Sequence, residues 1–211
     1  RKLALPNVNN LFRLLNYKAS ENRNTLSNLD NFADVNGVRI CYRTLGDPSH
    51  PPLLLVMGLG AQLIGWPEGF VQKFADEGFF VITFDNRDCG LSSKTEGEPE
   101  DSGELLVRAA IGEEVVQKYS LSDMALDSVS LLKNLGFEAA HIVGASMGGM
   151  IAQTIAIEHP SNALSLTSIM SATGNPEEFT PTEEAMNALL TPPEDERDQI
   201  IEANVNASKT L

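Results

Sequence analysis

A serine flanked by glycines stands between a strand pattern and a helix pattern. Residues 144–148 read Gly-Ala-Ser-Met-Gly, which fits G-x-S-x-G. The apolar run at 140–145 is typical of a buried strand, and 148–159 predicts a helix that ends before Pro160. Such a serine stands on a sharp strand-to-helix turn, where glycines remove Cβ atoms that would clash. Ser146 is therefore the candidate nucleophile, and we expect it to have a positive φ.

Two other interpretations of this motif stay open at this stage. A tight turn can use small residues for packing alone. A dinucleotide-binding loop would need glycine at position 146 and an acidic residue after the following strand, and the sequence has neither. For catalysis, the N-terminus of the following helix would offer unpaired N–H groups and a positive dipole end, which suit a developing oxyanion.

A hydrolytic serine needs a histidine base within hydrogen-bond reach, and none of the three histidines fits that role. His141 lies on the strand that leads to Ser146, roughly 16 Å away at about 3.3 Å per residue. His159 lies along the following helix, roughly 20 Å away, and His50 precedes the first buried strand. We expect all three to be surface or packing residues. Cys89 has neither a helix N-terminus nor a paired histidine, which favours a structural thiol.

The segments around Ser146 alternate between strand and helix patterns. Strands that are apolar on both faces and amphipathic helices follow one another, as in a parallel sheet covered on both faces. An alternating strand pattern precedes them after the turn signal Asn36-Gly37, which predicts a hairpin. The predicted strands are 38–45, 53–57, 79–84, 140–145 and 164–170, and the predicted helices are 68–77, 122–135 and 148–159. The predicted fold class is α/β.

Composition narrows the function classes. The 211 residues fit one domain plus a remnant, with 42% apolar and 21% charged residues. Fifteen basic against 29 acidic residues give a net charge of −14, which disfavours nucleic acid as a partner. No apolar run approaches the length of a membrane span. Two cysteines are too few for a disulfide scaffold and predict a reduced, cytoplasmic setting, and the absence of a zinc spacing predicts no metal.

Three segments carry a resemblance to a known family. Residues 55–62, 84–93 and 144–153 occur in the order and spacing of the α/β-hydrolase superfamily, which the sequence resembles over most of 35–175. They look most like the aclacinomycin methylesterase-like branch of serine esterases. The resemblance implies a mostly parallel sheet between helical layers, a three-layer sandwich of the α/β-hydrolase type.

The same resemblance implies a division of the chain. Residues 1–33 form a weakly patterned N-terminal segment, 34–175 the N-terminal part of the hydrolase core, and 176–211 the start of a truncated helical cap. In the resembled family, two strands after the cap deliver an acid and a histidine, so we expect this chain to be a fragment that lacks both. An acid at Glu177 or Glu178 is the alternative, with cap surface as the ordinary interpretation.

Site roles also follow from the resemblance. Ser146 maps to the nucleophile, and the backbone N–H groups of Met147 and Leu59 map to the oxyanion hole. Gly58 belongs to the substrate-binding loop, for which a plain turn is the alternative. Trp66 is a candidate wall of the acyl pocket, and a packing role is nearly as well supported.

The resemblance assigns the polar residues after the second buried strand a structural role. Asp85, Arg87 and Asp88 look like catalytic material. In the superfamily this loop is structural, and we therefore expect it to be held together by salt bridges.

The function implied is a cofactor-independent serine hydrolase of small-molecule carboxylic esters that works through an acyl-enzyme. A proline iminopeptidase-like amide hydrolase is the nearest alternative, and its Gly-Gly-x-Pro loop is absent at 57–60. Epoxide hydrolases use an aspartate nucleophile, which position 146 lacks. A non-catalytic binding module on a hydrolase fold is the other alternative.

Two properties of the isolated chain follow. Without a histidine base it should hydrolyse p-nitrophenyl acetate weakly at most. The strand at 164–170 should have an open edge, with Leu164, Leu166 and Ile169 in need of cover. We therefore expect aggregation or a homodimer through that edge.

Overall fold

The computed structural model describes residues 30–97, 105, 108, 113, 115–175 and 182. By internal contacts the chain divides into two compact units, one of residues 1–95 with 118–173 and one of 96–117 with 174–211. Few residues of the second unit are described, so the fold below is that of the first. Apart from residue 182, the expected cap lies outside the described residues, as do the acid candidates Glu177 and Glu178 and residues 1–29 of the N-terminal segment.

Six strands form one mixed sheet in the order β1-β2-β4-β3-β5-β6. The first two make the predicted hairpin, with Asn36 and Gly37 at positive φ in its turn. β2 is antiparallel to β4, and the four strands from β4 to β6 are parallel, so their carboxyl ends share one edge. The strands are β1 (Asn31–Val35), β2 (Val38–Leu45), β3 (Pro52–Val56), β4 (Phe80–Phe84), β5 (Ala140–Ala145) and β6 (Ala163–Ile169).

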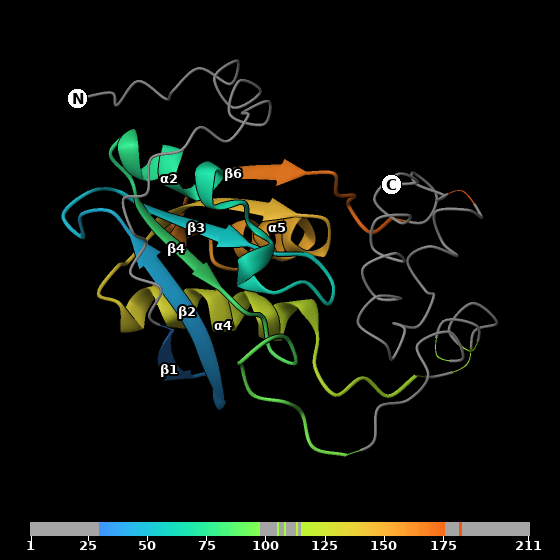
Figure 1. The fold of residues 1–211 in the computed structure, drawn as a ribbon. Coiled ribbons are helices and arrows are strands. Elements are labelled where there is room, and N and C mark those ends of the chain that lie inside the picture. The colour runs from blue at the N-terminus through green and yellow to red at the C-terminus, as the bar shows by residue number, and fades with distance from the viewer. Residues whose placement is uncertain are drawn as a thin grey trace, which may run out of the picture. The chain divides into compact units, whose positions relative to one another are not determined.

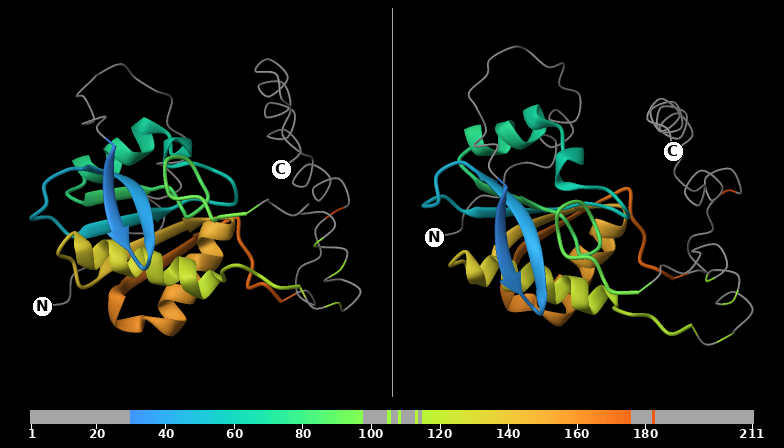
Figure 2. Two further views of the ribbon diagram at one scale, coloured as in Figure 1. Left: turned by 90° about the horizontal axis from the view of Figure 1, so that it is seen from below. Right: turned by 60° about the horizontal axis from the view of Figure 1, so that its bottom comes forward.

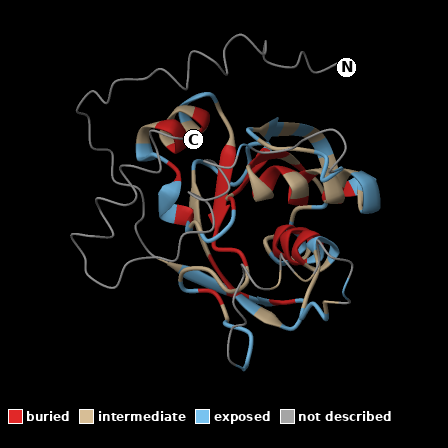
Figure 3. Ribbon diagram, turned by 90° about the vertical axis from the view of Figure 1, so that its right-hand side faces the viewer, coloured by how far each residue is buried: buried red, intermediate tan, exposed pale blue. Residues whose placement is uncertain are grey.

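Three helices cover the sheet, and alternate residues of the central strands explain how. Leu54, Ile82 and Ile142 pack in one core with α4 and α5, whereas Leu53 and Val81 pack in a second core with α2. The layers and the parallel strands are visible in Figures 1 and 2, and the buried centre in Figure 3. The helices are α2 (Glu68–Asp76), α4 (Leu121–Asn134) and α5 (Met147–Glu158), with short 3₁₀ turns η1 (Leu63–Gly65) and η2 (Pro160–Asn162). This confirms the α/β, three-layer prediction.

Local chemistry sets where these elements begin. The Ser120 side chain accepts the N–H of Asp123, and the Asp123 carboxylate accepts the N–H of Ser120. This capping box fixes the start of α4 where the sequence predicted it. The sheet begins at Asn31, three residues before the expected start of the core at residue 34.

The burial of residues on β2 and β6 differs from what the sequence predicted. Neighbouring residues Ile40 and Cys41 of β2 are both fully buried, because β2 lies inside the sheet and the loop after β4 folds back on it. Leu164 and Leu166 of β6 are exposed, but Ile169 points to the opposite face and packs in the α2-side core. No strand among the described residues pairs with the outer edge of β6. Self-association through that edge stays a prediction.

Candidate active site

Ser146 joins β5 to α5 in an unusual backbone conformation. Its φ is 54° and its ψ is −124°, which confirms the expected strained turn between a strand and a helix. Its N–H donates to the carbonyl of Ile169 on β6 (2.9 Å), and its carbonyl accepts the N–H of Gly149 (2.8 Å). Its side chain makes no capping hydrogen bond. Backbone contacts therefore hold the residue while its hydroxyl stays unused.

The glycines on either side of Ser146 are required by close backbone approaches. A Cβ at Gly144 would lie 2.6 Å from the nitrogen of Gly149, inside the turn itself. A Cβ at Gly148 would lie 2.7 Å from the carbonyl oxygen of Met57. The start of α5 is thus pressed against the end of β3, which is why this turn tolerates no side chain there.

The loop after β3 lies beside Ser146. A Cβ at Gly58 would lie 3.1 Å from the Ser146 Cβ and 3.6 Å from its Oγ. The N–H of Ala61 donates to the carbonyl of Gly58 (3.3 Å), and Gly60 has a φ of 67°, as in a type II turn. In a trans peptide the N–H points opposite to the carbonyl. The N–H of Leu59 therefore points out of this turn.

Two backbone donors near Ser146 are free. Within residues 30–97 and 115–175, neither the N–H of Leu59 nor that of Met147 donates to a protein acceptor. Met147 is the first residue of α5, so its N–H also lies at the positive end of the helix dipole. Free N–H groups of this kind can bind an anionic oxygen.

Asp85 holds the loop after β4 to the loop after β3. It is 2% exposed, and its two carboxylate oxygens accept the N–H groups of Leu63 (2.6 Å) and Leu91 (2.8 Å). Gly90 lies so close that any side chain there would collide with this carboxylate. Both oxygens are thus used in tying backbone together, which agrees with the expected structural role.

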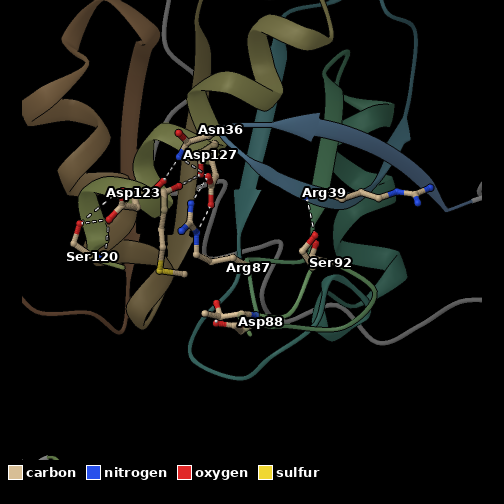
Figure 4. A network of polar contacts seen from close by, with 12 residues as sticks. Asn36, Arg39, Arg87, Asp88, Ser92, Ser120, Asp123 and Asp127 are labelled. Atoms are coloured by element: carbon tan, nitrogen blue, oxygen red, sulfur yellow. Dashed lines mark hydrogen bonds and ion pairs between the residues drawn. The ribbon is translucent and has the colours of Figure 1, made fainter. Parts of the chain in front are cut away.

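The neighbouring charges form the expected salt-bridged loop, shown in Figure 4. Arg87 donates two hydrogen bonds of 2.7 Å to Asp127 on α4, and Asn36 from the hairpin turn donates to the same carboxylate. Asp88 accepts the N–H and hydroxyl of Thr95. Burial opposes ionisation of Asp88, but these hydrogen bonds and one from Tyr119 leave its pKa below the usual value. These groups stabilise the loop and are not free for chemistry.

Other candidate nucleophiles and ligands are disfavoured by their surroundings. Burial raises the pKa of the Cys89 thiol, and nearby Lys94 only partly offsets this, so the reactive thiolate is scarce. Burial also raises the pKa of Cys41, to about 11. Among the described residues, no three histidine, cysteine or carboxylate side chains gather as a metal site would require. No helix in the described part of the chain is long and apolar enough to cross a membrane.

Trp66 has a packing environment rather than that of a pocket wall. Its side chain is buried in the α2-side core and stacks on Phe70, with ring centroids 5.5 Å apart. Together with Leu63 and Val71 it lines a cavity of about 70 Å³, well below the roughly 300 Å³ of a typical ligand pocket. These contacts favour the packing interpretation, and a role of Trp66 in an acyl pocket stays a prediction.

The histidines lie where the sequence placed them. His141 stands in register with Leu53 near the amino end of β5, where its Nδ1 lies 2.8 Å from the Ser165 hydroxyl. Burial lowers the pKa of His141. His159 follows α5, and His50 lies in the turn before β3. The described residues therefore supply no histidine beside Ser146.

Sequence reasoning missed Asn86. This residue is 2% exposed, and its Nδ2 donates to the carbonyl of Met57 (2.9 Å) at the start of the loop beside Ser146. The only signal in the sequence was a polar residue directly after a buried strand, between two charged ones. Nothing in the sequence indicates which backbone group such an amide reaches.

Comparisons with known proteins identify the family and the fold. A family model described as alpha/beta hydrolase fold matches residues 51–211. Rhodomycin D methylesterase DnrP of Streptomyces peucetius is 33% identical over 123 residues, 58% of this chain and 36% of that protein. Fluoroacetate dehalogenase of a Burkholderia species is 33% identical over 118 residues, 56% of this chain and 33% of that protein. The chain spans about a third of the length of these curated relatives.

Solved structures share the fold. ALR0039 from Nostoc sp PCC 7120 superposes with a TM-score of 0.62 at 24% identity, covering 89% of this chain and 60% of that one. Identity at that level supports the architecture alone.

Proposed function

The chain belongs to the alpha/beta hydrolase fold family, and from that membership we propose that it carries the nucleophile and oxyanion hole of a serine hydrolase of small-molecule carboxylic esters. The observation that supports this most is the backbone of Ser146. Its φ of 54° between β5 and α5 leaves the hydroxyl unengaged, and the loop of Gly58 approaches within 3.6 Å of that oxygen, measured to a Cβ built on the glycine.

The proposed reaction proceeds in two steps. The Ser146 oxygen attacks the ester carbonyl carbon, and the carbonyl oxygen becomes an oxyanion between the N–H groups of Leu59 and Met147. Collapse of this intermediate breaks the bond to the alcohol, which leaves with a proton, and an acyl-enzyme forms. Water then attacks the acyl carbon, releasing the acid and restoring the serine hydroxyl. No described histidine reaches Ser146, so the proton acceptor in this scheme comes from outside the described residues.

The substrate class rests on the named relatives. A methylesterase acts on an ester whose alcohol is small, and we propose an ester of this kind for this protein. Neither a metal nor a cofactor is needed in such a reaction, because serine, water and backbone donors supply every bond that changes.

Covalent labelling of the 211-residue chain tests the nucleophile directly. With imidazole added as the proton acceptor, an alkyl fluorophosphonate transfers its phosphoryl group to the serine: an oxygen–phosphorus bond forms, the phosphorus–fluorine bond breaks with release of fluoride, and imidazole takes the hydroxyl proton. Intact mass and peptide mapping should then show one adduct, on Ser146, which Ser146→Ala abolishes. An adduct on another residue, or none on a folded chain with imidazole present, would contradict the proposal.

Chemical rescue tests the missing base. Hydrolysis of p-nitrophenyl acetate should be weak and should rise when imidazole is added, after subtraction of the rate of Ser146→Ala at each imidazole concentration. A strong rate without imidazole that depends on Ser146 would mean that a base lies within the chain. A net rate that imidazole does not change would contradict base-limited catalysis by Ser146.

A further inference from the structure

The loop that carries the N–H of Leu59 is not held by its own packing. Leu59 is 60% exposed, and the only hydrogen bond within the turn is the one from Ala61 to Gly58, at 3.3 Å. An oxyanion donor must lie within about 3 Å of the developing charge, and a misplacement of about 1 Å can cost about 100-fold in rate. Something outside the turn must therefore hold it.

Hydrogen bonds from the end of β4 hold this loop on both sides of the turn. Asn86 donates to the carbonyl of Met57 (2.9 Å) before the turn, and Asp85 accepts the N–H of Leu63 (2.6 Å) after it. Both residues are 2% exposed. The exposed turn thus lies between two buried contacts with the loop after β4, and within the turn the Gly60 N–H also contacts the Cys89 thiol.

Of these two contacts, that of Asn86 is closer in sequence to the donor. Met57 directly follows β3, and its carbonyl lies against Gly148, whose added Cβ would be 2.7 Å from it. With its carbonyl held between the Asn86 amide and the start of α5, the planar Met57–Gly58 peptide has a fixed orientation. The next peptide unit is the one that contains the N–H of Leu59. A substitution of Asp85 would test the position of the turn less cleanly, because Asp85 also accepts the N–H of Leu91 in its own loop.

We propose that Asn86 is a positioning residue for catalysis: its buried amide fixes the Met57 carbonyl and thereby aims the N–H of Leu59 at the oxyanion formed on Ser146. This rests on the proposed function, since it requires Ser146 to be the nucleophile. Asn86 itself does not touch the substrate. Its effect is on the transition state, because ground-state binding does not depend on where that N–H points.

Asn162 provides a matched control. It is also a buried asparagine, 6% exposed, and its Nδ2 also donates to a backbone carbonyl, that of Glu138, at 2.5 Å. That contact lies at the amino ends of the parallel strands, whereas Ser146 lies at their carboxyl ends. Asn86→Ala and Asn162→Ala therefore remove the same kind of hydrogen bond, and only the first touches the loop beside Ser146.

The experiment measures fluorophosphonate labelling of Ser146 at several probe concentrations and one fixed imidazole concentration, which separates the maximal rate constant from the half-saturating concentration. Asn86→Ala should lower the maximal rate by about 10- to 100-fold with little change in half-saturation. Asn162→Ala should change it less than about twofold. Urea unfolding of both variants corrects the rates for any unfolded fraction.

A second variant provides a rescue. Asn86→Asp turns a negative oxygen toward the Met57 carbonyl, which should slow labelling, whereas the protonated acid can donate an O–H in place of the amide. The rate of Asn86→Asp relative to the unmodified chain should therefore recover as the pH is lowered. If Asn86→Ala does not fold, this pH-dependent ratio carries the test.

The outcomes are separable. If Ser146→Ala keeps its label, the proposed function fails, whatever Asn86 does. If the label depends on Ser146 but Asn86→Ala and Asn162→Ala slow it equally, the positioning role is overturned. A constant ratio for Asn86→Asp across pH would overturn it as well.

Discussion

A serine lies beside each end of β5, and the two serines have different environments. At the amino end, Ser165 of β6 lies 2.8 Å from the imidazole of His141, which packs edge-on against Phe79. At the carboxyl end, Ser146 has no described histidine beside it but stands at a φ of 54° next to two free N–H groups. The ends are roughly 16 Å apart along the strand.

The difference shows that residue types alone do not mark the candidate site. Ser165 and His141 are the pair that hydrolysis usually needs, yet both lie within strands, and no described helix begins beside Ser165. An oxyanion formed there would lack the N–H groups of a helix N-terminus. Ser146 has the donors because a helix begins immediately after it. Backbone geometry decides which serine is the better candidate.

Replacing each serine in turn should give the largest difference between the two ends of β5. Ser146→Ala should remove the imidazole-supported hydrolysis of p-nitrophenyl acetate, by at least about 100-fold, since nucleophile loss is the most costly change in such sites. Ser165→Ala should leave the rate within about twofold, because no helix N-terminus lies beside Ser165 to bind an oxyanion. The measurement is the release of p-nitrophenolate under identical conditions, and a large loss in Ser165→Ala would reverse the assignment of the two ends.

A side chain in the turn at the carboxyl end should destabilise the fold. Gly148→Ala would place a Cβ 2.7 Å from the Met57 oxygen, with backbone on both sides. Because neither element can move freely, we expect a loss of about 3 kcal/mol or more in the free energy of unfolding, together with slower labelling of Ser146. Urea denaturation followed by circular dichroism measures the first effect. A variant as stable as the unmodified chain would show that β3 and α5 are not in tight contact.

Two glycines at opposite ends of the parallel strands allow the effect of backbone strain on stability to be separated from an effect on labelling: Gly60 follows β3, and Gly78 precedes β4. Gly60 (φ 67°) and Gly78 (φ 83°) both have positive φ, and neither would bring a new Cβ within 4 Å of another residue. Alanine at either position should cost about 1 kcal/mol through backbone strain alone. Only Gly60→Ala should also slow labelling of Ser146, since its turn carries the N–H of Leu59. Equal labelling rates in the two variants would argue against that turn as an oxyanion donor.

The smallest expected effect is on the pH dependence of stability, through His141 at the amino end of β5. Burial lowers the pKa of His141 in the folded chain, so below about pH 6.5 the unfolded chain binds this proton more readily. Stability should therefore fall as the pH drops from that value toward the folded pKa. His141→Gln should show a smaller decrease in urea midpoint between about pH 7.5 and about pH 5.5. An unchanged pH dependence would mean that His141 titrates alike in both states.

Local patterns determined much of this molecule before any contact was known. Apolar runs such as 53–57 and 140–145 predicted buried strands because a strand covered on both faces must be apolar throughout. The pattern G-x-S-x-G predicted the positive φ of Ser146, because that backbone follows from residues next to it in the chain. Both features depend on short-range geometry.

The tertiary structure decided how residues far apart in the chain meet. In the sequence, a packing role for Trp66 was nearly as well supported as a pocket role, and its stacking on Phe70 in the α2-side core favours packing. Asn86 gave no sign that its amide reaches Met57, because that contact exists only once β4 lies beside β3. Such contacts depend on which strands are neighbours in the sheet. The pairing of β3 with β4, which are separated along the chain by a loop and a helix, produces no periodic residue pattern from which it could be predicted.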